Sequence, residues 1–205
     1  MIPVVCPAYL PNIYYCSWIL NQTKVLFIVD SHYQKQTFRN RCEIYGANGK
    51  LKLTIPVVHT KTKAPLKEKE VCISNETPWQ KQHWKSICSA YRSSPYFEFY
   101  ETELAPFFEK KETHLMQFNI QILIKIMELI EAPFSYEMVE WNINKHQRMD
   151  SLINAKKKID WKALPYTQVF QNKNGFLNNL SLLDVVFNLG PESFTYLKNQ
   201  KGITP

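Results

Sequence analysis

The run KVLFIVD, residues 24–30, is the feature that most restricts the fold of this chain. Its apolar residues follow one another without the alternation of a half-buried strand, and it ends in an acid. A continuous apolar run of this length is typical of a strand buried on both faces, as in a parallel sheet covered by helices. We therefore expect such a strand in the core.

The residues before this run predict a strand followed by a helix. Residues 2–5 form a short, mainly β-branched segment, and Pro7 and Pro11 confine the loop after it to extended or turn conformations. Apolar residues at helical spacing over 13–20 predict a helix. A strand, a helix and a strand in this order favour a right-handed parallel crossover.

A β-hairpin is predicted to follow. Asn48 and Gly49 form a strong turn signal because both residues tolerate positive φ. The arm at 50–55 alternates basic or polar residues with apolar ones, so one face is expected in the core and the other is basic and solvated.

Helices are predicted in the middle of the chain. Thr77 and Gln80 have the spacing of a capping box, and Pro78 suits the first helical position. The buried stripe of this helix is expected to comprise Trp84, Ile87, Cys88 and Tyr91. A short helix is expected to end near Pro106, and a long apolar helix covers 113–131.

The C-terminal part combines an irregular stretch with one clear helix. Weak periodicity over 133–176 indicates a less regular excursion. Ser181 and Asp184 have capping-box-like spacing before an apolar run, which Gly190-Pro191 ends. One interpretation of Ser181 and Asp184 is that they cap this helix and have no other role.

These patterns together predict one domain, residues 1–205, of the α/β (or α+β) class. We expect a small mixed β-sheet with a strand-helix-strand start and a basic hairpin, packed against a cluster of C-terminal helices. A chain of 205 residues that is 45% hydrophobic can form one sizeable core.

Composition restricts the compartment and the partners. Five cysteines without CxxC spacing argue against a disulfide framework and a structural zinc site, and favour a reducing compartment. The N-terminus lacks the pattern of a signal peptide, and polar residues interrupt the apolar helix at 113–131, so we expect a cytoplasmic protein without a membrane span. A net charge of +7 favours anionic partners.

Several chemical signatures are absent from the sequence. It contains no GxGxxG, GxxxxGK[ST], HExxH, GxSxG or DxD motif, and its histidines lack metal-ligand spacing. We therefore expect neither a metal nor a cofactor. Basic residues of the hairpin offer charge, but no RRM, KH or helix-turn-helix pattern accompanies them, so nucleic-acid binding is disfavoured.

Arg39, Asn40 and Arg41 concentrate hydrogen-bond donors just before the predicted hairpin. The planar guanidinium of an arginine can donate two parallel hydrogen bonds to a phosphate or a carboxylate, which favours an anion site here. The alternative is a polar strand start held by surface ion pairs. The Lys-rich loop at 57–74 is a candidate for a flap over such a site, or a solvated loop without a role.

The order of several motifs resembles the WbqC-like family of bacterial proteins. These motifs are PAYLP (7–11), VLFIVD (25–30), YQKQTFRNR (33–41), LTIPV (53–57), WQKQHWKSICSAYRSSPYF (79–97) and LSLLDVVFNLGPE (180–192). The resemblance covers residues 3 to 195 and implies a role in O-antigen or other surface-polysaccharide biosynthesis. It implies a transferase acting on a sugar or nucleotide sugar by glycosyl, acyl or aminoacyl transfer.

The family's opening His-Gln-Pro-x-Tyr-Leu-Pro falls on residues 5–11, where Val5 and Cys6 replace the His and the Gln. The remaining family positions are matched by Asp30, Asn40, Arg41, Trp79, His83, Trp84, Ser181 and Asp184. The missing His-Gln pair keeps a second function class open, that of a non-catalytic sugar-nucleotide-binding or partner-binding protein of the same pathway.

The resemblance raises the weight of the anion site and suggests roles. Asp30 or His83 would be the general base, and Arg39 or Arg41 would hold a phosphate or carboxylate. The further predicted substrate-binding residues are Tyr9, Asn40, Trp79, Tyr91 and Asp184, with the two tyrosines stacking on a sugar or base. A His beside a buried stripe is also typical of a packed core residue. Cys6 is interpreted as a buried, inert thiol rather than a nucleophile.

Overall fold

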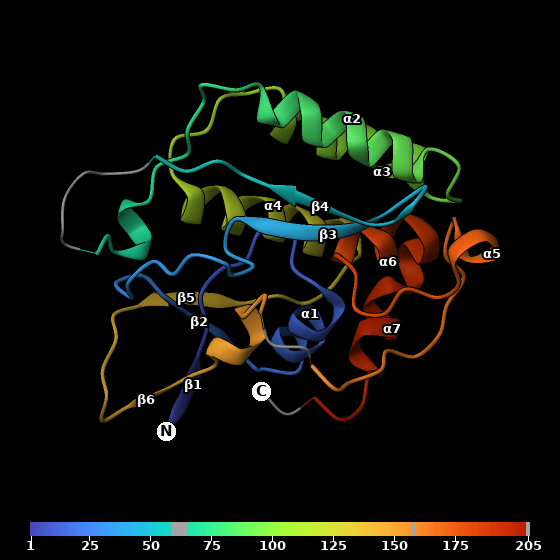
Figure 1. The fold of residues 1–205 in the computed structure, drawn as a ribbon. Coiled ribbons are helices and arrows are strands. Elements are labelled where there is room, and N and C mark those ends of the chain that lie inside the picture. Colours follow the sequence, from blue (N-terminus) through green and yellow to red (C-terminus); the bar gives the residue numbers. More distant parts are fainter. Residues whose placement is uncertain (59–64, 157–158, 204–205) are drawn as a thin grey trace.

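A row of four parallel strands lies at the base of the fold. The computed structural model describes residues 1–58, 65–156 and 159–203 (Figure 1). The four strands are β1 (Ile2–Val4), β2 (Val25–Ile28), β5 (Tyr136–Val139) and β6 (His146–Arg148). β1 pairs with β6 and β2 pairs with β5, both in parallel. A parallel bridge between Val5 and Phe27 joins the two pairs in the order β6-β1-β2-β5.

The connections of this row create a switch point beside β1. The chain leaves β1 through α1 (Ile13–Leu20) to reach β2, and it reaches β6 on the other side of β1 only after β5. Open α/β sheets bind ligands outside the carboxyl ends of their strands, where neighbouring connections run in opposite directions. In this fold, that place lies between the ends of β1 and β6.

The predicted crossover is present, but part of the sheet comes from an unexpected segment. Residues 133–176 supply β5 and β6, although the sequence pattern there predicted little regular structure. The residues of β5 are mostly exposed and β6 has only three residues, so neither shows the apolar run that marks β2. These strands form because β1 and β2 offer free edges for pairing, which local sequence does not reveal.

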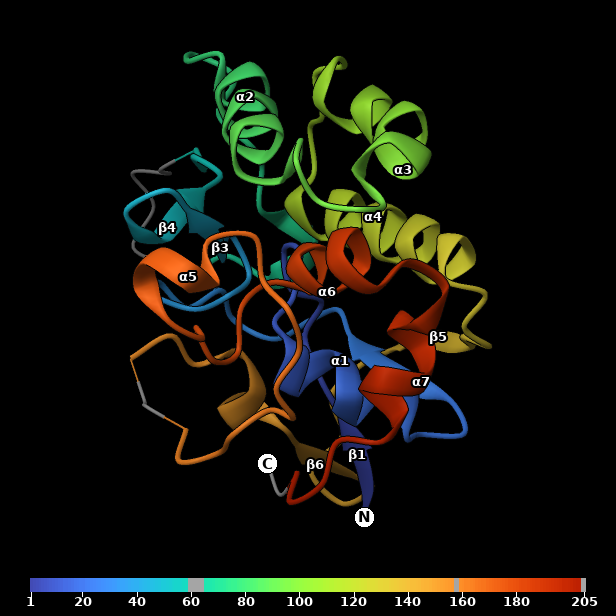
Figure 2. The same ribbon diagram turned by 90° about the vertical axis from the view of Figure 1, so that its right-hand side faces the viewer.

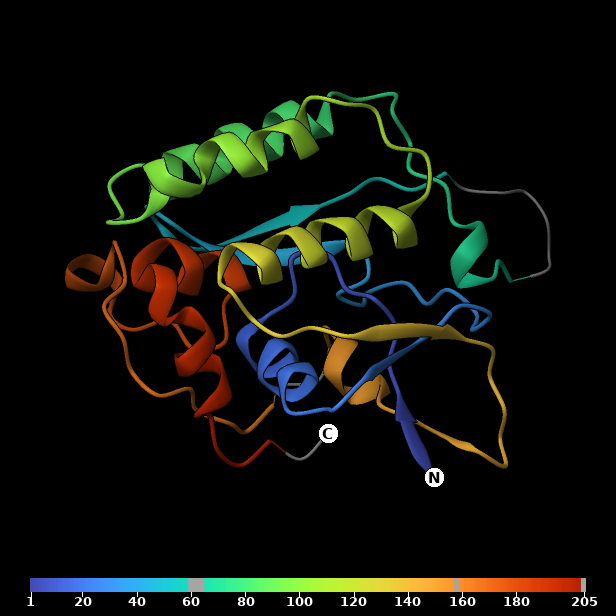
Figure 3. The ribbon, with the colours of Figure 1, turned by 180° about the vertical axis from the view of Figure 1, so that it is seen from behind.

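The predicted hairpin is confirmed. β3 (Arg41–Gly46) and β4 (Gly49–Thr54) pair in antiparallel register around the Asn48-Gly49 turn. The helices α2 (Trp79–Tyr91) and α3 (Phe97–Leu104) form an outer layer above this hairpin (Figure 3). A third of the Lys-rich loop proposed as a flap, residues 59–64, lies outside the described residues.

The remaining α-helices are α4 (Leu115–Leu129), α5 (Gln171–Asn174), α6 (Leu182–Leu189) and α7 (Ser193–Lys198). Three of them contribute to the core, whereas α5 has no buried residue. Figure 2 shows α6 and α7 beside α1, so the C-terminal helices cover the first crossover. The fold is of the α/β class, with small sheets packed against helices. In the described part of the chain, no helix has the length and apolarity needed to span a membrane.

The start of α2 differs from the capping box that its sequence predicts. Pro78 occupies the N-cap position, and no side chain caps the helix there. Gln80 instead donates to Asn75 at 2.9 Å and to the carbonyl of Lys110 at 3.3 Å. Two tertiary hydrogen bonds therefore replace the reciprocal bonds with Thr77.

The buried stripe of α2 is also rotated from its predicted position. His83, Ile87 and Tyr91 are buried, whereas Trp84 and Cys88 are only half-buried. His83 is thus part of the stripe rather than beside it, because the helix packs against β3 of the hairpin as well as against the short 3-10 helix Ala105–Phe108 that follows α3.

Gly190 ends α6 as the sequence predicts, and its backbone explains why glycine is needed. Its φ is +54°, and a Cβ at this position would overlap the ring of Tyr96. Most L-residues adopt such a φ only with strain.

We predict that Gly190→Ala lowers the free energy of unfolding by about 2–4 kcal/mol, since backbone strain and steric overlap add. Chemical denaturation with the fluorescence of the buried tryptophans measures this change. Gly175→Ala is the matched control, because Gly175 has a φ of +75° but open space around its Cβ position. Equal losses in both variants would show that the packing against Tyr96 contributes nothing.

Candidate functional site

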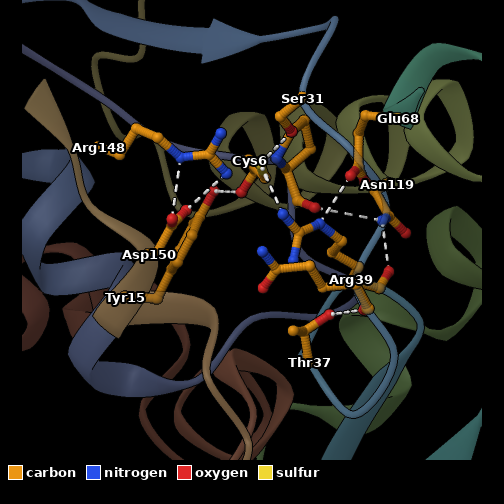
Figure 4. Close-up of polar contacts among 11 residues, drawn as sticks. Cys6, Tyr15, Ser31, Thr37, Arg39, Glu68, Asn119, Arg148 and Asp150 are labelled. Carbon is orange, nitrogen blue, oxygen red and sulfur yellow. Dashed lines mark hydrogen bonds and ion pairs between the residues drawn. The ribbon is translucent and has the colours of Figure 1, made fainter. Parts of the chain in front are cut away.

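Polar and charged side chains gather at the carboxyl ends of the parallel strands (Figure 4). We call this group the edge cluster; it comprises Cys6, Ser31, Arg39, Glu68, Arg148 and Asp150. Cys6 and Ser31 follow β1 and β2, and Arg148 ends β6. The group therefore lies at the switch point of the sheet.

A buried ion pair forms the centre of the edge cluster. Arg39 Nε donates to Glu68 Oε2 at 2.6 Å, and both side chains are 1% exposed. Arg39 Nη2 donates to the sulfur of Cys6 at 3.1 Å. Arg39 Nη1 and Glu68 Oε1 are buried without a hydrogen-bond partner in the described chain. Each charged group therefore lacks one hydrogen-bond partner, which is unfavourable in the protein interior unless a ligand or a water bonds to Nη1 and Oε1.

Backbone hydrogen bonds hold this pair from several directions. Asn119 of α4 donates from Nδ2 to the carbonyl of Arg39 at 2.7 Å. Phe38 donates to the carbonyl of Ile153, and Glu68 donates to the carbonyl of Ser31. The ion pair is therefore fixed by the end of β2, by the 3-10 helix Asp150–Ile153 and by α4.

Arg148 and Asp150 form the more accessible part of the edge cluster. Two hydrogen bonds of 2.9 and 3.1 Å join the guanidinium to the carboxylate. Their side chains are 26% and 46% exposed, so solvent and ligands reach both. The guanidinium of Arg148 also lies over the ring of Trp141, 5.7 Å from its centroid. An arginine held in this way presents a planar fork that suits phosphate or carboxylate.

Cys6 is a neutral component of this site. Its sulfur shares a hydrogen bond of 3.2 Å with the hydroxyl of Ser31. Burial raises the pKa of its thiol to about 11, although the positive charge of Arg39 opposes this shift. The thiol is therefore protonated at neutral pH, which agrees with an inert thiol rather than a nucleophile.

Two sequence-predicted residues, Asp30 and Arg41, border the edge cluster. Asp30 Oδ1 accepts from the backbone N–H of Trp141 at 2.7 Å, which connects the ends of β2 and β5.

Arg41 is half-buried, and its Nε has no partner among the described residues. Burial and Glu68 raise the pKa of Tyr33 to about 12, whereas Arg39 and Arg41 oppose the rise. Both arginines therefore act on the same phenol beside Glu68.

Asn40, between these arginines, has a structural contact. Its side-chain Nδ2 donates to the backbone carbonyl of Ile55 at 2.8 Å, and its backbone carbonyl accepts from the N–H of Ile55. This exchange fixes the base of the hairpin. The backbone between Arg39 and Arg41 is consequently fixed by these two hydrogen bonds.

Tyr9, Trp79 and His83 meet in the core between α2 and the hairpin. The hydroxyl of Tyr9 lies 2.9 Å from His83 Nδ1, and the imidazole also bonds to the backbone of Thr54. Trp79 packs edge-on against His83 with 5.2 Å between ring centroids. Burial lowers the pKa of His83 to about 4, so the imidazole is neutral at pH 7.

Tyr91 and Asp184 belong to a second buried network. Asp184 accepts hydrogen bonds from the hydroxyl of Tyr166 and from Gln168 Nε2. Burial raises the pKa of this carboxyl, and the hydrogen bonds from Tyr166, Gln168 and Tyr91 oppose the rise. The hydroxyl of Tyr91 also accepts from the N–H of Tyr45 at 3.1 Å.

The predicted site residues therefore occupy three places. Asp30, Arg39 and Arg41 border or form the edge cluster, whereas the contacts of His83 and Asp184 lie in the two core networks. In the described ranges, no group of three or more His, Cys, Asp or Glu side chains could hold a metal ion.

The sequence analysis missed Glu68, Arg148 and Asp150. Glu68 lies in a loop of alternating Lys and Glu, where nothing local marks one acid as buried. Arg148 and Asp150 could have been found from their i, i+2 spacing after a short strand, had β6 been recognised.

We predict that His83 makes the protein less stable in acid. Because its pKa is about 4 in the folded state and about 6.5 in the unfolded chain, the unfolded state binds more protons between these values. The contribution of His83 is thus fully present above pH 6.5 and falls as the pH approaches 4, by on the order of 3 kcal/mol.

Denaturation of the parent and His83→Gln from pH 7 to pH 4 tests this prediction. The stability of the variant should depend less steeply on pH than that of the parent. The exposed His114 provides the control variant His114→Gln, which should follow the parent. Parallel curves for the parent and His83→Gln would contradict the buried, neutral histidine.

We also predict that Glu68→Gln lowers the free energy of unfolding by about 3–5 kcal/mol, because it leaves Arg39 buried without a counter-charge. The double variant Arg39→Met, Glu68→Met should recover much of this loss. Glu103→Gln removes the exposed partner of Lys125 and should change stability by less than about 1 kcal/mol. The single variants Arg39→Met and Glu68→Met complete the cycle, and a loss in the double variant equal to the sum of the two single losses would contradict the pair.

Comparison with known proteins agrees with the motifs. The chain is 24% identical over 229 residues to the uncharacterised protein Rv1507c of Mycobacterium tuberculosis (strain ATCC 25618 / H37Rv), with 96% of this chain and 97% of that protein covered. No solved structure matches the chain. Residues 6–165, which include all of the edge cluster, match the WbqC-like protein family. The chain therefore belongs to the WbqC-like family.

Proposed function

We propose that this chain is a transferase that binds a nucleotide sugar at the edge cluster and acts in the biosynthesis of a bacterial surface polysaccharide. The observation that carries the proposal is the set of arginines and acids at the carboxyl ends of parallel strands, beside the switch point. Membership of the WbqC-like family supports it.

The phosphates of the donor would bind at Arg148. Its guanidinium is accessible, and Asp150 occupies Nε and Nη2. A phosphate would therefore bind at Nη1 or replace the carboxylate of Asp150, whose two parallel hydrogen bonds have the geometry that a phosphate also offers. Arg41 adds a half-buried positive charge beside Tyr33. Arg39, whose Nε and Nη2 are occupied, would mainly position the site, with Nη1 left for a ligand or a water.

Asp30 would act as the general base. Trp141 holds one of its oxygens, and the other oxygen accepts the proton of an acceptor hydroxyl or amine. The acceptor atom bonds to the transferred carbon while the bond from that carbon to its leaving group breaks. In glycosyl transfer, the electron pair remains on the departing phosphate oxygen, which the arginines stabilise. His83 is buried, bonds to the hydroxyl of Tyr9 through Nδ1 and has a pKa of about 4, so its role in this proposal is to hold Tyr9.

A non-catalytic nucleotide-sugar-binding protein is the second candidate. Val5 stands where the family has its histidine, and its side chain is buried and apolar. The neighbouring Cys6 carries a protonated thiol. Neither residue can replace an imidazole in proton transfer, which favours binding without turnover.

We predict that nucleotide sugars stabilise the protein through Arg148. Thermal unfolding is measured with UDP-glucose, UDP-N-acetylglucosamine, GDP-mannose and dTDP-glucose, and with uridine and pyrophosphate alone. A donor at about 100 times its Kd should add about 2.7 kcal/mol of stability. Arg148→Gln should abolish the shift, whereas Arg92→Gln, which changes the exposed arginine just after α2, should retain it.

Asp30→Asn separates the two candidates. The amide oxygen still accepts from Trp141, so the variant should bind the donor that stabilises the parent. An enzyme loses turnover in this variant, measured as release of the nucleotide in the presence of sugar acceptors. A parent protein that binds the donor but never releases nucleotide would support the binding protein instead. A panel without any stabilising nucleotide sugar would overturn both candidates.

A further inference from the structure

A polar pocket lies away from the edge cluster, where the start of α3 faces α5 and the end of α6. Its volume is about 500 Å³. The lining residues are Ser93, Ser94, Pro95, Thr167, Gln168, Val169, Gln171, Asn172 and Asn188. We propose that this pocket, which we call the amide pocket, binds a neutral sugar residue.

The chemistry of the lining carries the inference. Four of the nine side chains are amides and three carry hydroxyls, and none is ionisable. This is unusual for a surface feature of a chain in which 21% of the residues are charged. Amides and hydroxyls both donate and accept hydrogen bonds, as sugar hydroxyls do. Pro95 and Val169 add apolar surface for the C–H groups of a sugar ring.

The wall of the amide pocket is already ordered without a ligand. Gln168 is 2% exposed, and its Nε2 donates to Asp184 and to the carbonyl of Leu177. Its Oε1 accepts from the N–H of Leu177 at 2.8 Å. The Asp184 network therefore fixes the segment that carries Thr167 and Val169. A fixed wall reduces the entropy that binding has to overcome.

Other polar groups of the pocket remain available. In the described chain, the side chains of Ser93, Thr167 and Asn172 make no hydrogen bond, and all three are exposed. Asn188 donates from Nδ2 to the carbonyl of Asp184, which leaves its Oδ1 as an acceptor. These groups come from three separate segments and line one cavity, so they can contact different hydroxyls of one ring.

The lining favours a neutral sugar over other neutral ligands. A nucleobase is usually held by stacking on an aromatic ring or an arginine, and the lining contains neither. A charged sugar or a phosphate would lack a counter-charge here. The volume lies within the range of about 300–1,000 Å³ that is typical of small-molecule sites.

Saturation-transfer NMR on the full chain tests the amide pocket with maltose, lactose and diacetylchitobiose as probes. At least one disaccharide should bind. Thr167→Val and Asn172→Ala should each weaken that binding about 5- to 10-fold, the loss expected for about one hydrogen bond. Asn174→Ala lies on the same short helix but outside the pocket, and should bind like the parent.

Three results would overturn the inference: no disaccharide binds at tens of millimolar, the two pocket variants bind like the parent, or a neutral tripeptide competes as well as the sugars do. The outcome is independent of the proposed function. A loss of the Arg148-dependent response to nucleotide sugars leaves disaccharide binding untouched, and a failure of disaccharide binding leaves that response untouched.

Discussion

The buried ion pair between Arg39 and Glu68 is the interaction on which the arrangement of the site depends. Both side chains are almost completely removed from water, so the pair is stable only if its geometry and its surroundings are held in place. Asn119 fixes the backbone of Arg39 from α4, and Ser31 fixes that of Glu68 from the end of β2. The pair thereby connects the parallel strands, the core helix and the loop before α2.

The same pair determines what the carboxyl edge can bind. Glu68 neutralises the buried Arg39, and Asp150 pairs with the more accessible Arg148. Among the described residues Arg41 has no acidic partner, so the groups that a ligand can reach or attract are Arg41 and the exposed pair of Arg148 and Asp150, with Asp30 nearby. The Arg39–Glu68 pair thus positions the site, and Arg148, Arg41 and Asp30 carry out the proposed binding and proton transfer. The two core networks around His83 and Asp184 have a different part, since they hold α2 and α6 against the hairpin and order the wall of the amide pocket.

Features with a strong local signal could be predicted from the sequence. The apolar run at β2, the Asn48-Gly49 turn and the stop at Gly190 each follow from the residues at that place. Features that depend on distant partners could not. β5 and β6 are strands because neighbouring strand edges pair with them. Glu68 is buried because Arg39 requires a counter-charge. Gln80 does not cap α2 because Asn75 and Lys110 offer it other hydrogen-bond partners. Three predicted site residues form or border the edge cluster because they lie next to strands that the sequence predicted: Asp30 follows β2, Arg39 precedes β3, and Arg41 begins β3.

A crystal structure of the protein with UDP-glucose tests the central claim most directly. We predict density for the diphosphate at the carboxyl ends of β1 and β6, with its oxygens within hydrogen-bond distance of Arg148 and the Arg39–Glu68 pair intact beneath it. A nucleotide bound elsewhere, on the lysines of the hairpin or in the amide pocket, would contradict the account, as would an edge cluster left unchanged at saturating ligand.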